Sequence, residues 1–142
     1  MEIKNILIGI DPGTTTGVAI WNRRDKIFDY IGSGTIIDVF DIVESAQIAT
    51  QWKGCCELWF EDARQRTWYG TCGREKLQGV GSIKRDCNIW EEYCINRNIP
   101  FRMVAPRHIR TKTTAETFYR LTGWKRMTNK HARDAGMICF QG

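Results

Sequence analysis

Several features that would assign a chain of this length to a special class are missing from the sequence. Its six cysteines include no CxxC pair, and neither of the two histidines is spaced to complete a zinc site with them. There is no apolar run long enough to cross a membrane, no N-terminal signal pattern and no internal repeat. We therefore expect one domain over residues 1–142, in a cytoplasmic protein whose thiols are reduced and mostly buried.

Positive charge is scarce in the first part of the chain and concentrated in the second. Residues 1–62 contain 5 Lys and Arg against 10 Asp and Glu, whereas residues 63–142 contain 16 against 6. Aromatic side chains are interleaved with the basic residues of the second part. Such asymmetry is typical of a protein that binds a polyanion, most simply nucleic acid, although a solubilising basic face would produce the same pattern.

The order of apolar periodicities predicts an α/β domain. In chain order, the expected elements are strands at Ile3–Asp11, Gly17–Trp21 and Lys26–Gly34, a helix capped by Asp38 and ending near residue 52, a strand at Glu57–Asp62, a helix from Ser82 to Arg97, a strand at Phe101–Val104, and helices at Thr114–Leu121 and Lys130–Phe140. Residues 63–81 lack periodicity and are expected to form a mobile loop running into the next helix. A hairpin pair followed by crossovers implies a mixed five-stranded sheet with helices packed against it.

Asp11 occupies the most informative stretch of the sequence. An apolar run leads to it, the turn formers Pro12 and Gly13 follow, and a second apolar run begins after Gly17. So short a link predicts a β-hairpin, with the carboxylate at the end of a buried strand. A carboxylate there is costly unless it is paired or binds a cation. The simpler alternative is that Asp11 only accepts hydrogen bonds from the turn.

Two further acidic residues occupy comparable positions. Glu61 ends the predicted fourth strand, while Asp134 follows His131 by three residues, so that these two share a helix face. If the first and fourth strands are parallel neighbours, Asp11 and Glu61 meet at one edge of the sheet. Crowded carboxylates repel each other unless a divalent cation neutralises them, and oxygen ligands favour Mg²⁺ or Mn²⁺. Two such ions about 4 Å apart would support phosphodiester hydrolysis.

Each of these residues also has an interpretation without catalysis. Glu61 would suit an ion pair with Arg64 or Arg66, and His131 with Asp134 would suit a solvated pair on a helix surface. The presence of all four residues together favours the metal site.

Three motifs carry a resemblance to a known family. They are Ile8–Gly13 at the start of the chain, Trp59–Asp62 in the middle, and His131–Ala135 near the end. Together they resemble the RuvC family of Holliday-junction resolvases, of the short kind found among bacteriophage proteins. The resemblance implies a ribonuclease H-like fold, with helices on both faces of the mixed sheet. It also implies a metal-dependent endonuclease that resolves four-way junctions and acts in the cytoplasm, which for a phage protein is that of the host cell.

The resemblance further implies roles for individual residues. Asp11 would bridge two Mg²⁺ or Mn²⁺ ions, Glu61 would join one of them, and His131 with Asp134 would hold the other. Basic residues after the predicted fifth strand would contact the scissile phosphate, where this chain has an Arg-x-x-Arg-x-Lys pattern in place of the Lys-rich run usual in the bacterial family. Aromatic residues of the middle loop could stack on unpaired bases. The candidate DNA contacts are Arg64, Arg66, Trp68, Tyr69, Arg74, Lys76, Lys84, Arg107, Arg110 and Lys112.

A four-way junction offers two symmetric scissile phosphates, so a homodimer is the expected assembly, with the helix from Ser82 to Arg97 as a candidate dimer face. Two other functions stay open. One is a different nuclease of the ribonuclease H fold, acting on flaps or RNA–DNA hybrids. The other is a non-catalytic protein that binds branched DNA. An actin-type ATPase is disfavoured, because 142 residues are too few for the two domains that such an enzyme needs.

Overall fold

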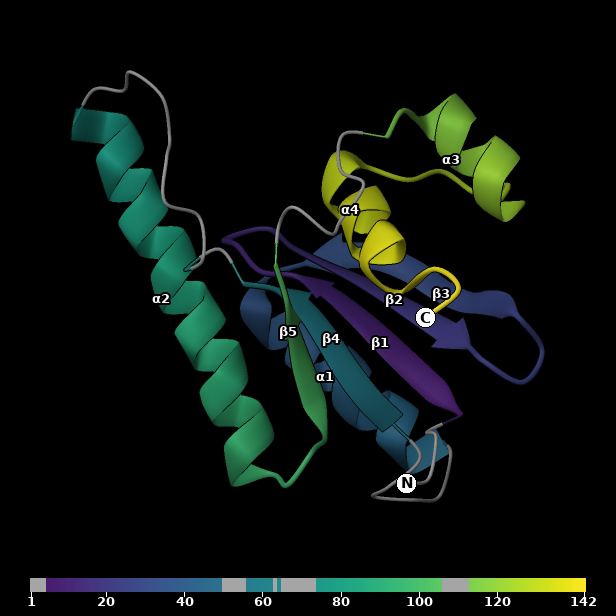
Figure 1. Cartoon of the computed structure of the whole chain (residues 1–142), viewed down its shortest axis with the longest axis horizontal. Helices are drawn as coiled ribbons and strands as arrows, with labels where there is room; N and C mark the ends of the chain where they lie inside the picture. Colours follow the sequence, from purple (N-terminus) through teal and green to yellow (C-terminus); the bar gives the residue numbers. More distant parts are fainter. Residues whose placement is uncertain (1–4, 50–55, 63, 65–73, 106–112) are drawn as a thin grey trace.

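The computed structural model describes residues 5–49, 56–62, 64, 74–105 and 113–142, and within them it forms an α/β domain. In chain order the elements are β1 Ile6–Asp11, β2 Thr16–Asn22, β3 Ile27–Gly34, α1 Ile36–Ala49, β4 Cys56–Glu61, α2 Arg74–Asn96, β5 Phe101–Val104, α3 Ala115–Thr122 and α4 Lys130–Cys139 (Figure 1). The five predicted strands and four predicted helices are therefore all confirmed, with changes at their ends.

The sheet is mixed, as the sequence predicts. Its strand order is β3-β2-β1-β4-β5, with β1 at the centre. The first three strands are antiparallel neighbours, whereas β4 runs parallel to β1 and β5 parallel to β4. The parallel register pairs Ile10 with Phe60, so the next residues of the two strands, Asp11 and Glu61, lie level with each other.

Alternation along the strands divides the interior into two hydrophobic cores, one on each face of the sheet. Ile6, Ile8 and Ile10 of β1 contribute to the core under α1 and α2, where Trp90 and Phe40 pack edge to face with ring centroids 4.7 Å apart. Leu7 contributes to the opposite core, which α4 and Phe118 of α3 cover. Helices thus cover both faces, with α4 and α1 on opposite sides of the sheet in Figure 1.

Caps define most of the helix ends. Asn129 begins α4 by accepting a hydrogen bond from Ala132 N, Thr114 caps α3 in the same way, and Gly123 ends α3 in the left-handed conformation. The cap predicted for the first helix is wrong by three residues. Thr35 is the N-cap, because its hydroxyl accepts a hydrogen bond from Asp38 N while the Asp38 carboxylate accepts one from Thr35 N. This reciprocal pair is a capping box, with Asp38 at its third helical position.

Helix α2 also begins earlier than the sequence predicts. It starts at Arg74, whereas the expected start is Ser82. The first two turns therefore lie in the range 63–81 that was expected to be a loop. These turns are not predicted because Gly81 lowers the helix propensity of this stretch. The rest of that range, residue 63 and residues 65–73, lies outside the described part of the chain, as does the predicted end of the first helix near residue 52.

The described cysteines agree with the expectation of reduced, buried thiols. Cys56, Cys87, Cys94 and Cys139 are all buried. Burial raises the pKa of the Cys94 and Cys139 thiols to about 12, so both stay protonated near neutral pH. Among the described residues, no helix is both long enough and apolar enough to span a membrane.

Candidate active site

Two strand ends place the first two carboxylates. Asp11 is the last residue of β1 and Glu61 is the last residue of β4. Ile10 and Phe60 point into the core under α1 and α2, so the residues that follow them face the opposite side, toward α4. Parallel pairing then sets Asp11 and Glu61 side by side at one end of the sheet. The prediction that these two residues meet at one sheet edge is confirmed.

Two glycines let α4 lie directly on the sheet beside these carboxylates. A Cβ at Gly9 would collide with the backbone carbonyl of Ala135, and a Cβ at Gly17 would collide with that of His131. The close approach of α4 therefore depends on small residues of the sheet as well as on Ala132 and Ala135, which are buried against it. Gly136 serves a different purpose, because its missing side chain makes room for the Phe118 ring of α3.

The two predicted helix residues converge on Asp11. His131 Nδ1 lies 3.3 Å from Asp11 Oδ2, and this is the hydrogen-bond partner of Asp11 within the described part of the chain. Burial and, to a smaller extent, the nearby charges of Asp134 and Glu61 together raise the pKa of Asp11 to about 8, while the charge of Lys130 opposes them. Among the described residues, the hydrogen-bond partner of Asp11 is therefore His131 and not the Pro-Gly turn. Three carboxylates and one imidazole therefore lie near one another at this end of the sheet.

The donor set fits a divalent cation. Asp134 is 9% exposed, and its Oδ1 atom is buried without a hydrogen-bond partner among the described residues, which is costly for a carboxylate oxygen. Three carboxylates with one imidazole are hard donors of the kind that Mg²⁺ and Mn²⁺ accept. In the described part of the chain, no three His, Cys, Asp or Glu side chains lie close enough together to hold a metal ion as they stand.

Arg64 is held by acidic residues next to the site. Its Nε atom lies 2.8 Å from Asp62 Oδ1, and its Nη1 atom lies 2.6 Å from Glu91 Oε2 of α2. These carboxylates raise the pKa of Arg64, with the Asp62 hydrogen bond as the largest cause. Arg64 therefore joins the residue after β4 to α2, instead of forming the ion pair with Glu61 considered from the sequence. Cys87 of α2 also contacts this strand end, 3.4 Å from the Glu61 carbonyl oxygen. This network makes a structural role the better interpretation of Arg64, which was predicted to contact DNA.

The other predicted DNA contacts are less completely placed. Arg74 and Lys76 lie in the first turn of α2, where only the backbone is described, and Lys84 is half-buried farther along the same helix. The remaining candidates lie outside the described residues: Arg66, Trp68, Tyr69, Arg107, Arg110 and Lys112.

Lys130 is a site residue that the sequence interpretation missed. It is the first residue of α4, next to His131, and its charge lowers the pKa of Asp11. The N-terminus of a helix also carries partial positive charge, which adds to that of the lysine. The available signal in the sequence was a basic residue at the start of the helix that carries His131 and Asp134.

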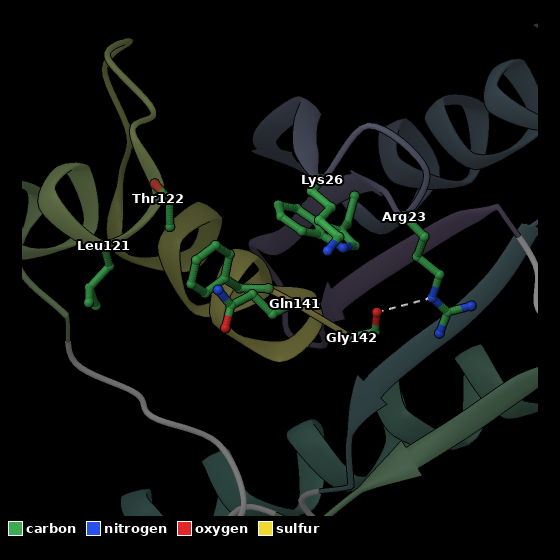
Figure 2. A pocket seen from close by; sticks show the side chains of 8 residues that line it. Arg23, Lys26, Leu121, Thr122, Gln141 and Gly142 are labelled. Carbon is green, nitrogen blue, oxygen red and sulfur yellow. Dashed lines mark hydrogen bonds between the residues drawn. The ribbon is translucent and has the colours of Figure 1, made fainter.

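A separate pocket lies at the other end of β1 from these carboxylates. It has a volume of about 390 Å³ and is lined by residues that include Trp21, Lys26, Leu121 and Phe140 (Figure 2). Arg23 Nε donates a hydrogen bond to the Gly142 carbonyl oxygen across 3.2 Å at its edge. Trp21 pairs with Leu7, near the start of β1, so the pocket lies at the opposite end of the strand from Asp11.

The strand order, the mixed sheet and the helices on both faces define a ribonuclease H-like α/β fold. The chain is similar in structure to T. thermophilus RuvC, solved in complex with a Holliday junction substrate. The TM-score is 0.60 at 13% sequence identity, and the alignment covers 96% of this chain and 91% of that one. No family model matches the sequence, and no curated protein matches it at a significant level. The expected fold class is confirmed.

Proposed function

We propose that this chain is a metal-dependent, structure-specific endonuclease that cuts branched DNA and resolves four-way junctions. The observation that carries the proposal is the convergence of Asp11, Glu61, His131 and Asp134 at one end of a RuvC-like sheet. The structural neighbour was solved with a Holliday junction, and the basic second part of this chain suits a DNA partner.

In this proposal the four side chains hold two Mg²⁺ or Mn²⁺ ions. When bound, such ions would activate a water and stabilise the leaving oxygen of the phosphodiester. Burial, together with the nearby charges of Asp134 and Glu61, raises the pKa of Asp11, and a cation bound there would offset both effects. The hydrogen bond between His131 and Asp11 orients the Asp11 side chain, and the buried Asp134 offers an oxygen that has no hydrogen-bond partner within the described residues.

A homodimer remains part of the proposal, because two symmetric phosphates call for two active sites. The structure changes where its interface can lie. Cys87, Trp90 and Cys94, the recurring apolar residues of α2, are buried in this chain's own core or against β4. They are therefore unavailable to a partner, whereas Ile95 is a large apolar side chain that α2 leaves exposed.

The experiment compares metal-dependent cleavage of labelled four-way junction, flap, linear duplex and RNA–DNA hybrid. Each substrate is incubated with Mg²⁺, with Mn²⁺ or with EDTA, and the matched control is Asp11→Asn. We expect the wild type to cut the junction best with either metal and to be inactive in EDTA. The Asn variant should bind the junction without cutting it. Light scattering of the free protein tests the dimer.

Other outcomes would change the proposal in defined ways. Preferred cutting of the flap or the hybrid would make this a different nuclease of the same fold. Binding of the junction without cleavage of any substrate would leave a non-catalytic DNA-binding protein. Equal activity of wild type and Asp11→Asn would remove the carboxylate cluster from the reaction and overturn the proposal.

A further inference from the structure

The sheet face that carries the carboxylates is only partly covered. Helix α4 packs over β1, β2 and β3, while among the described elements no helix lies over β5 on this side (Figure 1). Phe101 and Met103 pack into the core of the other face, so Arg102 of β5 faces the same side as α4. Its neighbour across the strand pair is Trp59 of β4. Two residues beyond Trp59, about 7 Å along the strand, lies Glu61.

Two arginines lie over the Trp59 ring, and they differ in what else they contact. The Arg23 guanidinium carbon is 5.5 Å from the ring centroid, but its charge is paired with Glu57 at 3.2 Å. Arg102 lies 5.2 Å from the same centroid and is exposed. Within the described residues, Arg102 has no ion pair. Its guanidinium is thus held in place by the ring while its hydrogen-bond donors remain directed to solvent.

The position of this arginine matters electrostatically. The nearby end of the sheet carries three carboxylates, which repel any phosphate that approaches. A DNA strand crossing toward them needs fixed positive charge on the same face. Arg102 supplies such a charge on the open part of the sheet, and its planar guanidinium can donate two hydrogen bonds to one phosphate.

We propose that Arg102, held over Trp59, contacts the phosphodiester backbone of a DNA strand that crosses β4 and β5 on its way to the carboxylates. This inference rests on the proposed function, because it assigns part of the path of the same substrate. Arg102 does not act on the reacting bond. It positions the strand next to the site, and Trp59 limits the motion of the guanidinium.

The chain offers a matched control. Arg97, the residue after α2, is also exposed and also lies over an aromatic ring, 4.6 Å from the centroid of Tyr93. Tyr93 belongs to the core on the opposite face of the sheet, and Arg97 is paired with Glu44 there. Arg97→Ala therefore removes the same charge and a similar stacking contact from the side away from the carboxylates.

The test measures binding of a labelled four-way junction in EDTA at several salt concentrations, so that no cleavage is needed. We expect Arg102→Ala to weaken binding roughly tenfold at low salt and to reduce the slope of log Kd against log salt by about one. Arg102→Lys should keep the wild-type slope, because it keeps the charge, while binding falls by a smaller factor. Arg97→Ala should match the wild type. Circular dichroism spectra confirm that each variant is folded.

The outcomes separate this inference from the proposed function. If Arg102→Ala binds with wild-type affinity and slope, or if Arg97→Ala loses as much, Arg102 is not a backbone contact and the inference fails even when the wild type cuts junctions. If the wild type cuts nothing but the Arg102 variants still lose affinity and slope, the contact stands and the nuclease proposal fails. A wild type that does not bind DNA overturns both.

Discussion

The two faces of the sheet use the same strands for different purposes. On the side of α1 and α2, β1 and β4 present large apolar residues such as Ile10 and Phe60, which are fully buried. On the side of α4, the adjacent residues are glycines and carboxylates, and the helix backbone rests on the sheet. Phe60 and Glu61 are neighbours in sequence yet belong to different environments. One strand can therefore contribute core residues on one face and candidate site residues on the other, because its side chains alternate.

The largest expected effect comes from the carboxylate face. Glu61→Gln and Asp134→Asn should each lower the cleavage rate roughly 10⁴-fold, because each removes a charged oxygen from the proposed metal site. The free energy of unfolding should stay within about 1 kcal/mol of the wild type or rise, since repulsion is relieved. Single-turnover cleavage of the junction and urea denaturation measure the two quantities. A variant that kept more than a tenth of the rate would not be a metal ligand.

Phe60→Ala tests the other face at the adjacent residue. Removing this fully buried ring should cost about 4 kcal/mol of unfolding free energy, through lost burial and the cavity left behind. The cleavage rate per folded molecule, measured well below the melting temperature, should fall much less than in Glu61→Gln. Equal loss of rate in both variants would show that the two faces are not separable.

Gly17→Ala should lower stability by about 2 kcal/mol and also reduce cleavage, because the added Cβ collides with the His131 backbone and displaces the start of α4. Thermal unfolding and the cleavage rate would be followed together. Loss of stability with an unchanged rate would mean that the position of α4 does not matter for the site.

The pKa of Asp11 predicts how stability depends on pH. Burial and the neighbouring carboxylates raise this pKa from 3.8 to about 8 in the folded protein. Between these values the folded state retains a proton that the unfolded chain has released, so stability in EDTA should fall as pH rises through this window, by at most about 1.4 kcal/mol per pH unit. Asp11→Asn should remove the dependence, and Mg²⁺ should stabilise the wild type more at pH 8 than at pH 5. Urea denaturation at the two pH values provides the measurement, and a flat profile for the wild type would contradict the charge crowding.

Gly81→Ala should have the smallest effect, and its effect on stability should be opposite in sign to that of Gly17→Ala. Gly81 is exposed within α2, and a Cβ added there meets no atom within 4 Å. The substitution should therefore raise the free energy of unfolding by about 0.5–1 kcal/mol, through reduced entropy of the unfolded chain and better helix propensity. Cleavage should not change. A loss of stability would indicate that this part of α2 packs against another surface.

Much of the fold was predictable because its signals are local. The apolar run ending at Asp11, the Asn129 cap and the three-residue spacing of His131 and Asp134 each depend on neighbours in sequence. Where the sequence interpretation was wrong, weak local propensity misled it. The glycine at position 81 lowers helix propensity, so the first turns of α2 are not predicted. Asp38 is predicted as the N-cap of α1, but Thr35 is the N-cap.

By itself, the sequence determined the order of strands and helices, the two-residue alternation that separates Phe60 from Glu61, and the identity of the four candidate ligands. Only the tertiary structure decided which residues meet. The pairing of Arg64 with Glu91, the placement of α4 on Gly17, and the lack of a described ion pair at Arg102 all depend on how segments far apart in the chain are arranged. The physical reason is that charge pairing and close packing are properties of distances in space, which local propensity does not encode.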